Sequence, residues 1–126
     1  MARNGYSVKI DDASRELSAK ERVMYKDTAC CVRLDDATKA GEVVIDIDMW
    51  VALSVHNENT ADVDYHNYVI VDKDGTRYIT GSNGFWNTFT DIWEDMSECE
   101  EPWTLTVYRK PSKNYSGKEF ITCSIS

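Results

Sequence analysis

The sequence has few of the residues that build metal, catalytic or membrane sites. Of its 126 residues only two are histidine, and its four cysteines form no Cys-x-x-Cys pair, which argues against a zinc site. No apolar run approaches the roughly 18 residues of a membrane-spanning helix, and no apolar stretch of the signal-peptide type follows residues 1–5. We therefore expect a cytosolic protein without a metal, a cofactor or a membrane partner.

Positive charge is also scarce. The formal net charge is −8, which argues against a protein that coats DNA indiscriminately. The sign is uneven, however: residues 87–108 include six acidic and no basic residues, whereas residues 109–126 include four basic residues and one acidic. The sequence thus predicts a basic loop on an acidic body.

The composition is sufficient for one domain with a packed core, since 42% of the residues are hydrophobic and four Trp, seven Tyr and three Phe are present. From residue 42 onward, alternation predicts strands at 42–57, 65–71 and 77–80, a helix at 85–96, and strands at 103–108 and 120–125. The first strand is long and changes phase, so we expect it to bend and to pair with two sheets. The order βββαββ is typical of a five-stranded OB-like barrel in a mainly β protein.

The predicted helix between the third and fourth strands has a single apolar stripe suited to closing one end of such a barrel. The stripe consists of Phe85, Phe89, Ile92, Trp93 and Met96. Ser82 or Asn83 is placed to cap the start of this helix. The only two prolines, Pro102 and Pro111, fall in predicted connections.

Residues 1–41 precede the predicted barrel and read as an arm that packs on it. Ser18 and Glu21 have the spacing of a capping box, which predicts a short helix as far as about Lys26. Tyr6, Val8 and Ile10 alternate and could add an edge strand, and residues 35–41 are turn-like. We therefore divide the chain into an N-terminal extension (1–41) and an OB-like barrel (42–126) that form one folding unit.

The best candidate site is the loop between the last two strands, and the second is the middle hairpin, because in OB proteins the loop flanks the ligand face and the hairpin carries it. Tyrosines there can stack on unpaired bases, and Arg and Lys can neutralise phosphates. The nucleic-acid-binding candidates are Tyr65, Tyr68, Arg77, Tyr78, Arg109, Lys110, Lys113, Tyr115 and Lys118, with Tyr108 as a further stacking residue. Only one parity of a strand can face a ligand, and strand packing or a solvated basic hairpin would explain the same residues, so the sequence leaves this choice open.

No catalytic residue is predicted. Asp46 and Asp48 point the same way from one strand, but neither a third ligand nor a nucleophile accompanies them. His56 and His66 flank one connection without an evident partner for catalysis. The expected protein is therefore a binding protein and not an enzyme.

The region from about residue 26 to residue 125 resembles small OB-fold single-stranded DNA-binding-like proteins of phages and mobile elements of Gram-positive bacteria. The segments that carry the resemblance are 68–75, 78–82, 85–86, 109–114, 117–118 and Phe120. The resemblance implies a cytoplasmic single-stranded DNA-binding protein of phage replication or recombination, and such proteins often act as homo-oligomers. The alternative is a phage-encoded inhibitor that binds a host defence or nucleic-acid enzyme through its acidic surface. DNA, RNA and protein ligands all remain open at this stage.

Overall fold

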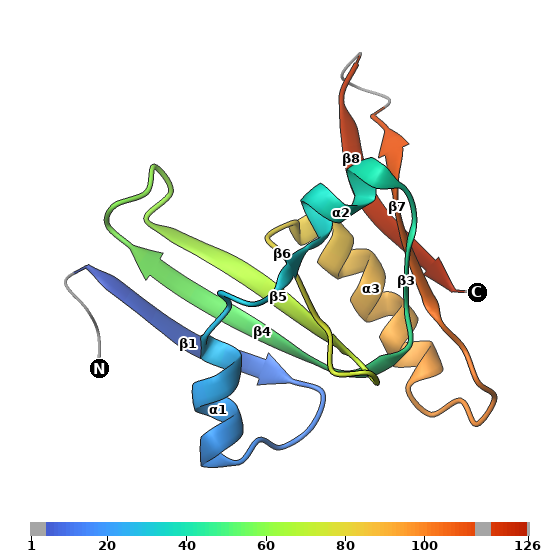
Figure 1. The fold of residues 1–126 in the computed structure, drawn as a ribbon, viewed down its shortest axis with the longest axis horizontal. Coiled ribbons are helices and arrows are strands. Elements are labelled where there is room, and N and C mark those ends of the chain that lie inside the picture. The colour runs from blue at the N-terminus through green and yellow to red at the C-terminus, as the bar shows by residue number, and fades with distance from the viewer. Residues whose placement is uncertain (1–4, 113–116, 126) are drawn as a thin grey trace.

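The computed structural model of the chain describes residues 5–112 and 117–125. Figure 1 shows the path of the chain through them. In chain order the elements are β1 (Tyr6–Ala13), α1 (Ala19–Lys26), β2 (Val32–Arg33), α2 (Leu34–Ala40), β3 (Val43–Ile45), β4 (Ile47–Asn57), β5 (Asp64–Asp72), β6 (Arg77–Thr80), α3 (Asn83–Met96), β7 (Leu105–Pro111) and β8 (Glu119–Ile125).

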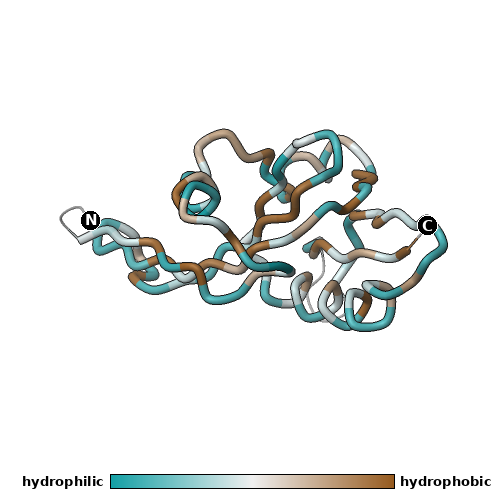
Figure 2. The backbone as a smooth tube through the Cα atoms, turned by 90° about the horizontal axis from the view of Figure 1, so that it is seen from below, coloured by the Kyte–Doolittle hydropathy of each residue, from teal (hydrophilic) through white to brown (hydrophobic). Residues whose placement is uncertain are grey.

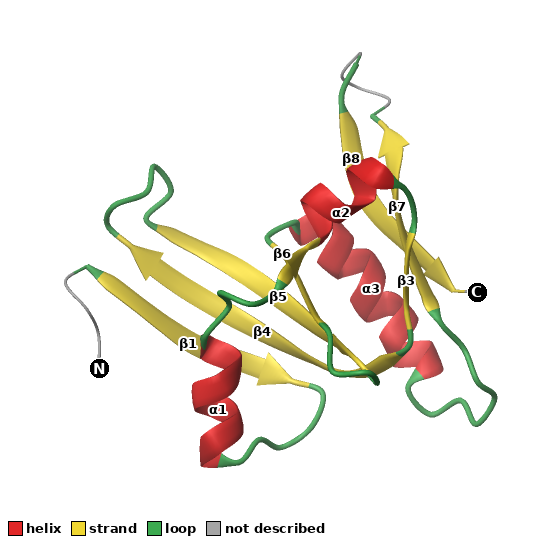
Figure 3. Cartoon of the chain, in the orientation of Figure 1, coloured by secondary structure: helices red, strands yellow, loops and turns green. Residues whose placement is uncertain are grey.

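The strands form two sheets, so the fold is mixed α/β and mostly strand (Figure 3). One sheet has the order β1-β4-β5-β6-β2 and the other has the order β3-β7-β8. Every neighbouring pair is antiparallel except β2 with β6. No helix among the described residues is both long enough and apolar enough to cross a membrane.

One long run of chain links the two sheets, as its change of phase predicted. β3 pairs with β7, whereas β4, which begins two residues after β3 ends, pairs with β1 and β5. The β5–β6 turn supports the bend at Asp46, because the Asp72 carboxylate accepts the Asp46 N–H at 3.0 Å and the Lys73 N–H donates to the Asp46 carbonyl at 2.9 Å. A register shift between Ile47 and Met49 follows directly. The expected bend is therefore confirmed.

Two cores lie on opposite faces of the five-stranded sheet. Between the two sheets and under α3 lies the first core, which includes Leu34, Ile45, Trp50, Ile70, Phe85, Phe89, Leu105 and Val107. Beneath α1 lies the second core, which includes Leu17, Tyr25, Met49, Val51, Leu53, Val69, Val71 and Ile79. Strand β4 is thus buried on both faces, which explains why its apolar run shows no clear alternation. Figure 2 shows that many of the hydrophobic stretches, in brown, lie toward the middle of the molecule.

The helix starts follow the predicted caps. Ser18 Oγ accepts the Glu21 N–H at 3.2 Å while the Glu21 carboxylate accepts the Ser18 N–H at 3.0 Å, which confirms the capping box at α1. Ser82 Oγ accepts the Phe85 N–H at 3.2 Å at the start of α3. Both helices therefore begin where their sequence requires.

The predicted barrel is not confirmed, because neither sheet closes. The expected turn at residues 35–41 is largely the helix α2, which contacts β6 of one sheet and β3, β7 and β8 of the other. Figure 1 shows α2 between β6 and the β7–β8 hairpin. Within the described residues the edge of β6 pairs with the two residues of β2 instead of with β8. Helix α2 thus lies against both sheets, beside β6 of one and the β7–β8 hairpin of the other.

Candidate nucleic-acid interface

The four candidate residues on β5 and β6 lie in different environments. Tyr68 is only 8% exposed, its ring stacks on Trp86 with centroids 4.5 Å apart, and its hydroxyl donates to Asn83 Oδ1 at 2.6 Å. Burial raises the pKa of Tyr68. This residue is therefore part of the first core and presents no free ring face comparable to that of a surface tyrosine.

Arg77, Tyr78 and Tyr65 differ in what they touch. The Arg77 guanidinium donates to the Met24 carbonyl at 3.0 Å and to the Asp27 carbonyl at 3.3 Å, so it satisfies the C-terminal end of α1. Tyr78 is half-buried against the first core, and burial raises its pKa. Tyr65 is half-buried and lines two surface hollows. Of this group, Tyr65 is the residue that a ligand in those hollows would meet.

The β7–β8 hairpin brings together three of the predicted cations. Arg109 points toward α2, where its Nε donates to Thr38 Oγ1 at 3.1 Å and its Nη2 donates to the Asp35 carbonyl. Lys110 and Lys118 are exposed near the end of the hairpin. The remaining two candidates of this loop, Lys113 and Tyr115, lie outside the described residues. Arg109 is thus engaged in holding α2, while Lys110 faces solvent.

The outer face of this hairpin carries aromatic rings beside a cation. Lys110 is directly opposite Phe120 in the β7–β8 register, and Tyr108 is opposite Thr122. The Lys110 ammonium lies 6.0 Å from the centroid of the Tyr108 ring, and Phe120 is 48% exposed. Val44 on the neighbouring strand is also 56% exposed.

Phe120 had no assigned role in the sequence, since alternation does not show which parity of a strand faces solvent. The structure settles the parity, because Ile121 and Cys123 are buried against the first core. Burial raises the pKa of the Cys123 thiol to about 12. The even-numbered residues of β8 therefore form the outer face, with Phe120 at its end.

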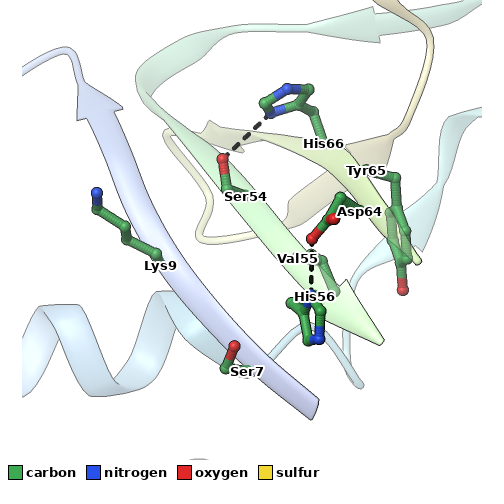
Figure 4. Close-up of a pocket in the computed structure, with 8 residues that line it drawn as sticks. All are labelled: Ser7, Lys9, Ser54, Val55, His56, Asp64, Tyr65 and His66. Carbon is green, nitrogen blue, oxygen red and sulfur yellow. Dashed lines mark hydrogen bonds and ion pairs between the residues drawn. The ribbon is translucent and has the colours of Figure 1, made fainter. Parts of the chain in front are cut away.

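A second feature is a hollow of about 320 Å³ at the far end of the five-stranded sheet (Figure 4). Its lining residues are Ser7 and Lys9 of β1, Ser54, Val55 and His56 of β4, and Asp64, Tyr65 and His66 of β5. Both histidines of the chain are therefore in one hollow. His56 Nδ1 lies 2.7 Å from Asp64 Oδ1, and His66 Nδ1 lies 3.3 Å from Ser54 Oγ.

The trio of Ser54, His66 and Asp11 has the residue types of a nucleophilic relay but a different geometry. The Ser54 hydroxyl donates to Asp11 Oδ2, which is 3.7 Å from His66 Nδ1. In a relay the serine proton goes to one imidazole nitrogen while the carboxylate holds the other. Here both neighbours lie at Nδ1, so the geometry suits fixing the His66 ring rather than activating Ser54.

An adjoining hollow of about 520 Å³ shares Tyr65 and His66 with the first. Its other lining residues are Arg33, Asp35, Thr60, Ala61, Asp62, Asn67, Gly81 and Ser82. We call the two hollows together the β5 groove. Its cations are Lys9 in the first hollow and Arg33 in the second. Its carboxylates are Asp64 in the first hollow and Asp35 and Asp62 in the second. The groove therefore combines aromatic rings with charges of both signs.

No described group of three or more His, Cys, Asp or Glu side chains could hold a metal ion. Comparison with known proteins gave no match to a family model, to a curated protein or to a solved structure. The case for a function therefore depends on the residues of this chain.

Proposed function

We propose that this chain is a non-catalytic single-stranded DNA-binding protein that uses the outer face of the β7–β8 hairpin. The observation that carries the proposal is the half-exposed ring of Phe120, opposite Lys110, whose ammonium lies over Tyr108. Binding of unpaired strands requires stacking surfaces beside cations, and this face offers both. Duplex DNA hides its base faces, so the rings favour an unpaired strand.

The strand pairing supports an OB-like arrangement as part of this proposal. The bent run β3–β4 acts as a first strand that pairs with the second (β5) and the fourth (β7). The third strand (β6) pairs with β5, and the fifth (β8) pairs with β7. This leaves closure between β6 and β8 as the missing step, where α2 is inserted. OB folds are partly open barrels, and their loop between strands four and five contacts ligand.

Fluorescence anisotropy with a labelled single strand and with the duplex of the same sequence tests the proposal at about 50 mM and 200 mM salt. We expect binding to the single strand that weakens as salt rises. Phe120→Ala should weaken it by roughly 5- to 150-fold, since one base stack contributes about 1–3 kcal/mol. Lys110→Glu should weaken it and reduce the salt dependence.

Two substitutions serve as matched controls. Lys20→Glu makes the same charge change at an exposed position of α1, and Val23→Ala removes another exposed apolar side chain of α1. Neither should alter binding. The proposal fails when the wild-type protein does not bind single strands at low salt, or when Phe120→Ala and Lys110→Glu bind as the controls do.

A second candidate function is binding to a basic surface of another protein, as an inhibitor that imitates a phosphate backbone. The observation that favours it is the acidic segment formed by Asp91, Glu94, Asp95, Glu98, Glu100 and Glu101. All six are exposed, and none forms an ion pair with a described residue. Capture from a bacterial lysate by immobilised protein tests this candidate. A partner retained by the wild type and lost from the triple Gln variant of Glu94, Asp95 and Glu98 would support it.

A further inference from the structure

Four aromatic rings form a continuous series from the first core to the β5 groove. Phe89 contacts Trp86 with centroids 4.9 Å apart, Trp86 stacks on Tyr68 at 4.5 Å and 9°, and Tyr68 stacks on His66 at 6.2 Å and 15°. The first three rings are buried, whereas the His66 side chain is 53% exposed. The series therefore ends in a flat ring that is nearly parallel to the ring of Tyr68, on a residue that lines both hollows of the groove.

We propose that His66 forms a stacking site for an unpaired nucleobase, which we call the seat. The base stacks on the imidazole and extends this series of rings. The seat rests on the proposed function, since it assigns a second contact for the same bound strand. The ligand class expected at the seat is a planar base with its phosphate.

The His66 ring is held more firmly than a typical surface side chain. The neighbouring Tyr68 ring is fixed by its hydrogen bond to Asn83. Ser54 Oγ and Asp11 Oδ2 lie 3.3 Å and 3.7 Å from His66 Nδ1. A ring with a fixed orientation loses little conformational entropy when a base stacks on it, so its position favours binding.

A cation for the adjacent phosphate lies in the same row of the sheet. Lys9 of β1 pairs in register with Ser54 of β4, which pairs with His66 of β5. Two strand spacings separate Lys9 from His66 by about 10 Å. Lys9 is exposed and forms no ion pair with any described residue.

Three other ionisable side chains face the seat. Asp11 comes from β1, His56 from β4 and Asp64 from β5. Asp11 and Asp64 oppose a phosphate, so stacking on the ring has to supply most of the affinity at this position. The seat should therefore respond to changes in the ring more than to changes in salt.

Nuclear magnetic resonance of the two imidazoles tests the seat directly. The chain has only two histidines, so His56 acts as an internal reference in the same hollow. One arm adds an oligodeoxyadenylate of about 16 nucleotides, the upper end of the site size for one OB-type domain. The other arm adds deoxyadenosine monophosphate. We expect the oligonucleotide to shift the His66 ring signals upfield by ring current, and to shift those of His56 much less.

Affinity measurements on three variants complete the test. His66→Ala should weaken binding of the oligonucleotide by roughly 5- to 150-fold, the effect of one lost stack. His66→Phe keeps a flat ring and should restore most of the affinity. His56→Ala removes the other imidazole of the same hollow; its ring is paired with Asp64 and lies outside the aromatic series, so it should weaken binding less than His66→Ala does.

The outcomes separate the seat from the proposed function. Binding of single strands that His66→Ala leaves unchanged, with no shift at His66, would overturn the seat and leave the proposed function standing. A His66 shift with the mononucleotide alone, and no oligonucleotide binding, would overturn the strand as its ligand and the proposed function together. Equal losses for His66→Ala and His56→Ala would also overturn the seat, since charge or general disruption would then explain both.

Discussion

Arg109 and Lys110 are neighbours in sequence but lie on opposite faces of β7. Truncating one should therefore change a different property of the protein from truncating the other. Both were candidates for phosphate binding. Arg109 donates to Thr38 Oγ1 and to the Asp35 carbonyl, so it fixes α2 against the three-stranded sheet. Lys110 is exposed and lies over the Tyr108 ring. We therefore expect Arg109→Ala to reduce stability and Lys110→Ala to reduce binding.

The size of the Arg109 effect follows from its two hydrogen bonds. A hydrogen bond from a charged donor contributes about 1.5–3 kcal/mol. Truncation leaves the Thr38 hydroxyl its bond to the Leu34 carbonyl at 2.7 Å and leaves the Asp35 carbonyl its i+4 bond within α2, so the loss is that of the two guanidinium bonds alone. We therefore expect Arg109→Ala to lower the free energy of unfolding by about 2–3 kcal/mol. At about 4 °C for each kcal/mol, the Tm should fall by about 8–12 °C.

Urea unfolding followed by tryptophan fluorescence measures the loss, and anisotropy at several salt concentrations measures binding. Lys110→Ala should change the free energy of unfolding by no more than about 0.5 kcal/mol. It should reduce the slope of log affinity against log salt by about 0.7, the value for one phosphate contact on a single strand. Arg22→Ala removes an exposed arginine of α1 that forms no ion pair with a described residue, and it serves as the control.

The reversed pattern would refute this reasoning. An Arg109→Ala protein as stable as the Arg22→Ala control, with a smaller salt slope, would mean that Arg109 binds phosphate and does not hold α2. Arg109→Lys separates charge from geometry, since an ammonium keeps the charge but lacks the two-pronged guanidinium. It should recover little of the lost stability.

Four further measurements follow from the structure. A thiol reagent at pH 8 should label the exposed cysteines of the native protein but label Cys123 only after unfolding, because burial raises the pKa of this thiol to about 12. Ser18→Ala should lower the free energy of unfolding by about 1 kcal/mol, through loss of the α1 cap. The Arg15 hydrogen bond lowers the pKa of Glu21 to about 2, so this carboxylate stabilises the fold above its ordinary pKa of 4.5 and stops doing so as pH falls toward 2; Glu21→Gln should flatten that acid-side loss in pH-dependent unfolding. Leu34→Ala should cost about 2–5 kcal/mol in urea unfolding, since this side chain at the start of α2 is fully buried.

The sequence alone was sufficient to predict the elements that are specified by their own residues. The bend between β3 and β4 was visible as a change of phase in one long apolar run. The stripe that begins at Phe85 predicted α3, and Ser82 supplies its cap. These features depend on local periodicity and capping, which a single sequence displays directly.

Helix α2 was not predictable in the same way. Because its residues were expected to form a turn, nothing in the sequence suggested a helix between the two sheets, and a barrel was predicted. Its seven residues include Asp35, Asp36 and Thr38, which favour turns, and its N-cap residue Arg33 makes no side-chain cap. Only Leu34 and Thr38 are buried, which is too short a pattern to reveal a helix. Contacts from Arg109, distant in sequence, stabilise it instead, and local propensity gives no sign of them.

The sequence pointed to β5, β6 and the β7–β8 hairpin as candidate binding elements but did not give the environment of each residue. The aromatic residues of β5 gave Tyr65 and Tyr68 as candidates, but the sequence could not show that the Tyr68 ring would be buried beside His66. His66 looked like a polar surface residue, since its partners Ser54 and Asp11 come from other strands. Burial of a ring and exposure of its neighbour depend on how α3 covers the sheet, which is a tertiary property.

The acidic charge of the whole chain has a consequence for how a strand would be held. With a net charge of −8, long-range repulsion opposes the approach of any polyanion, and the described cations near the hairpin and groove are few. Raising salt would screen this repulsion as well as the local attraction of Lys110, so the two effects would partly cancel. The salt slope should therefore be shallower than a count of lysine contacts suggests. Affinity must then come mainly from stacking, which makes Phe120 and His66 more sensitive to truncation than any single lysine.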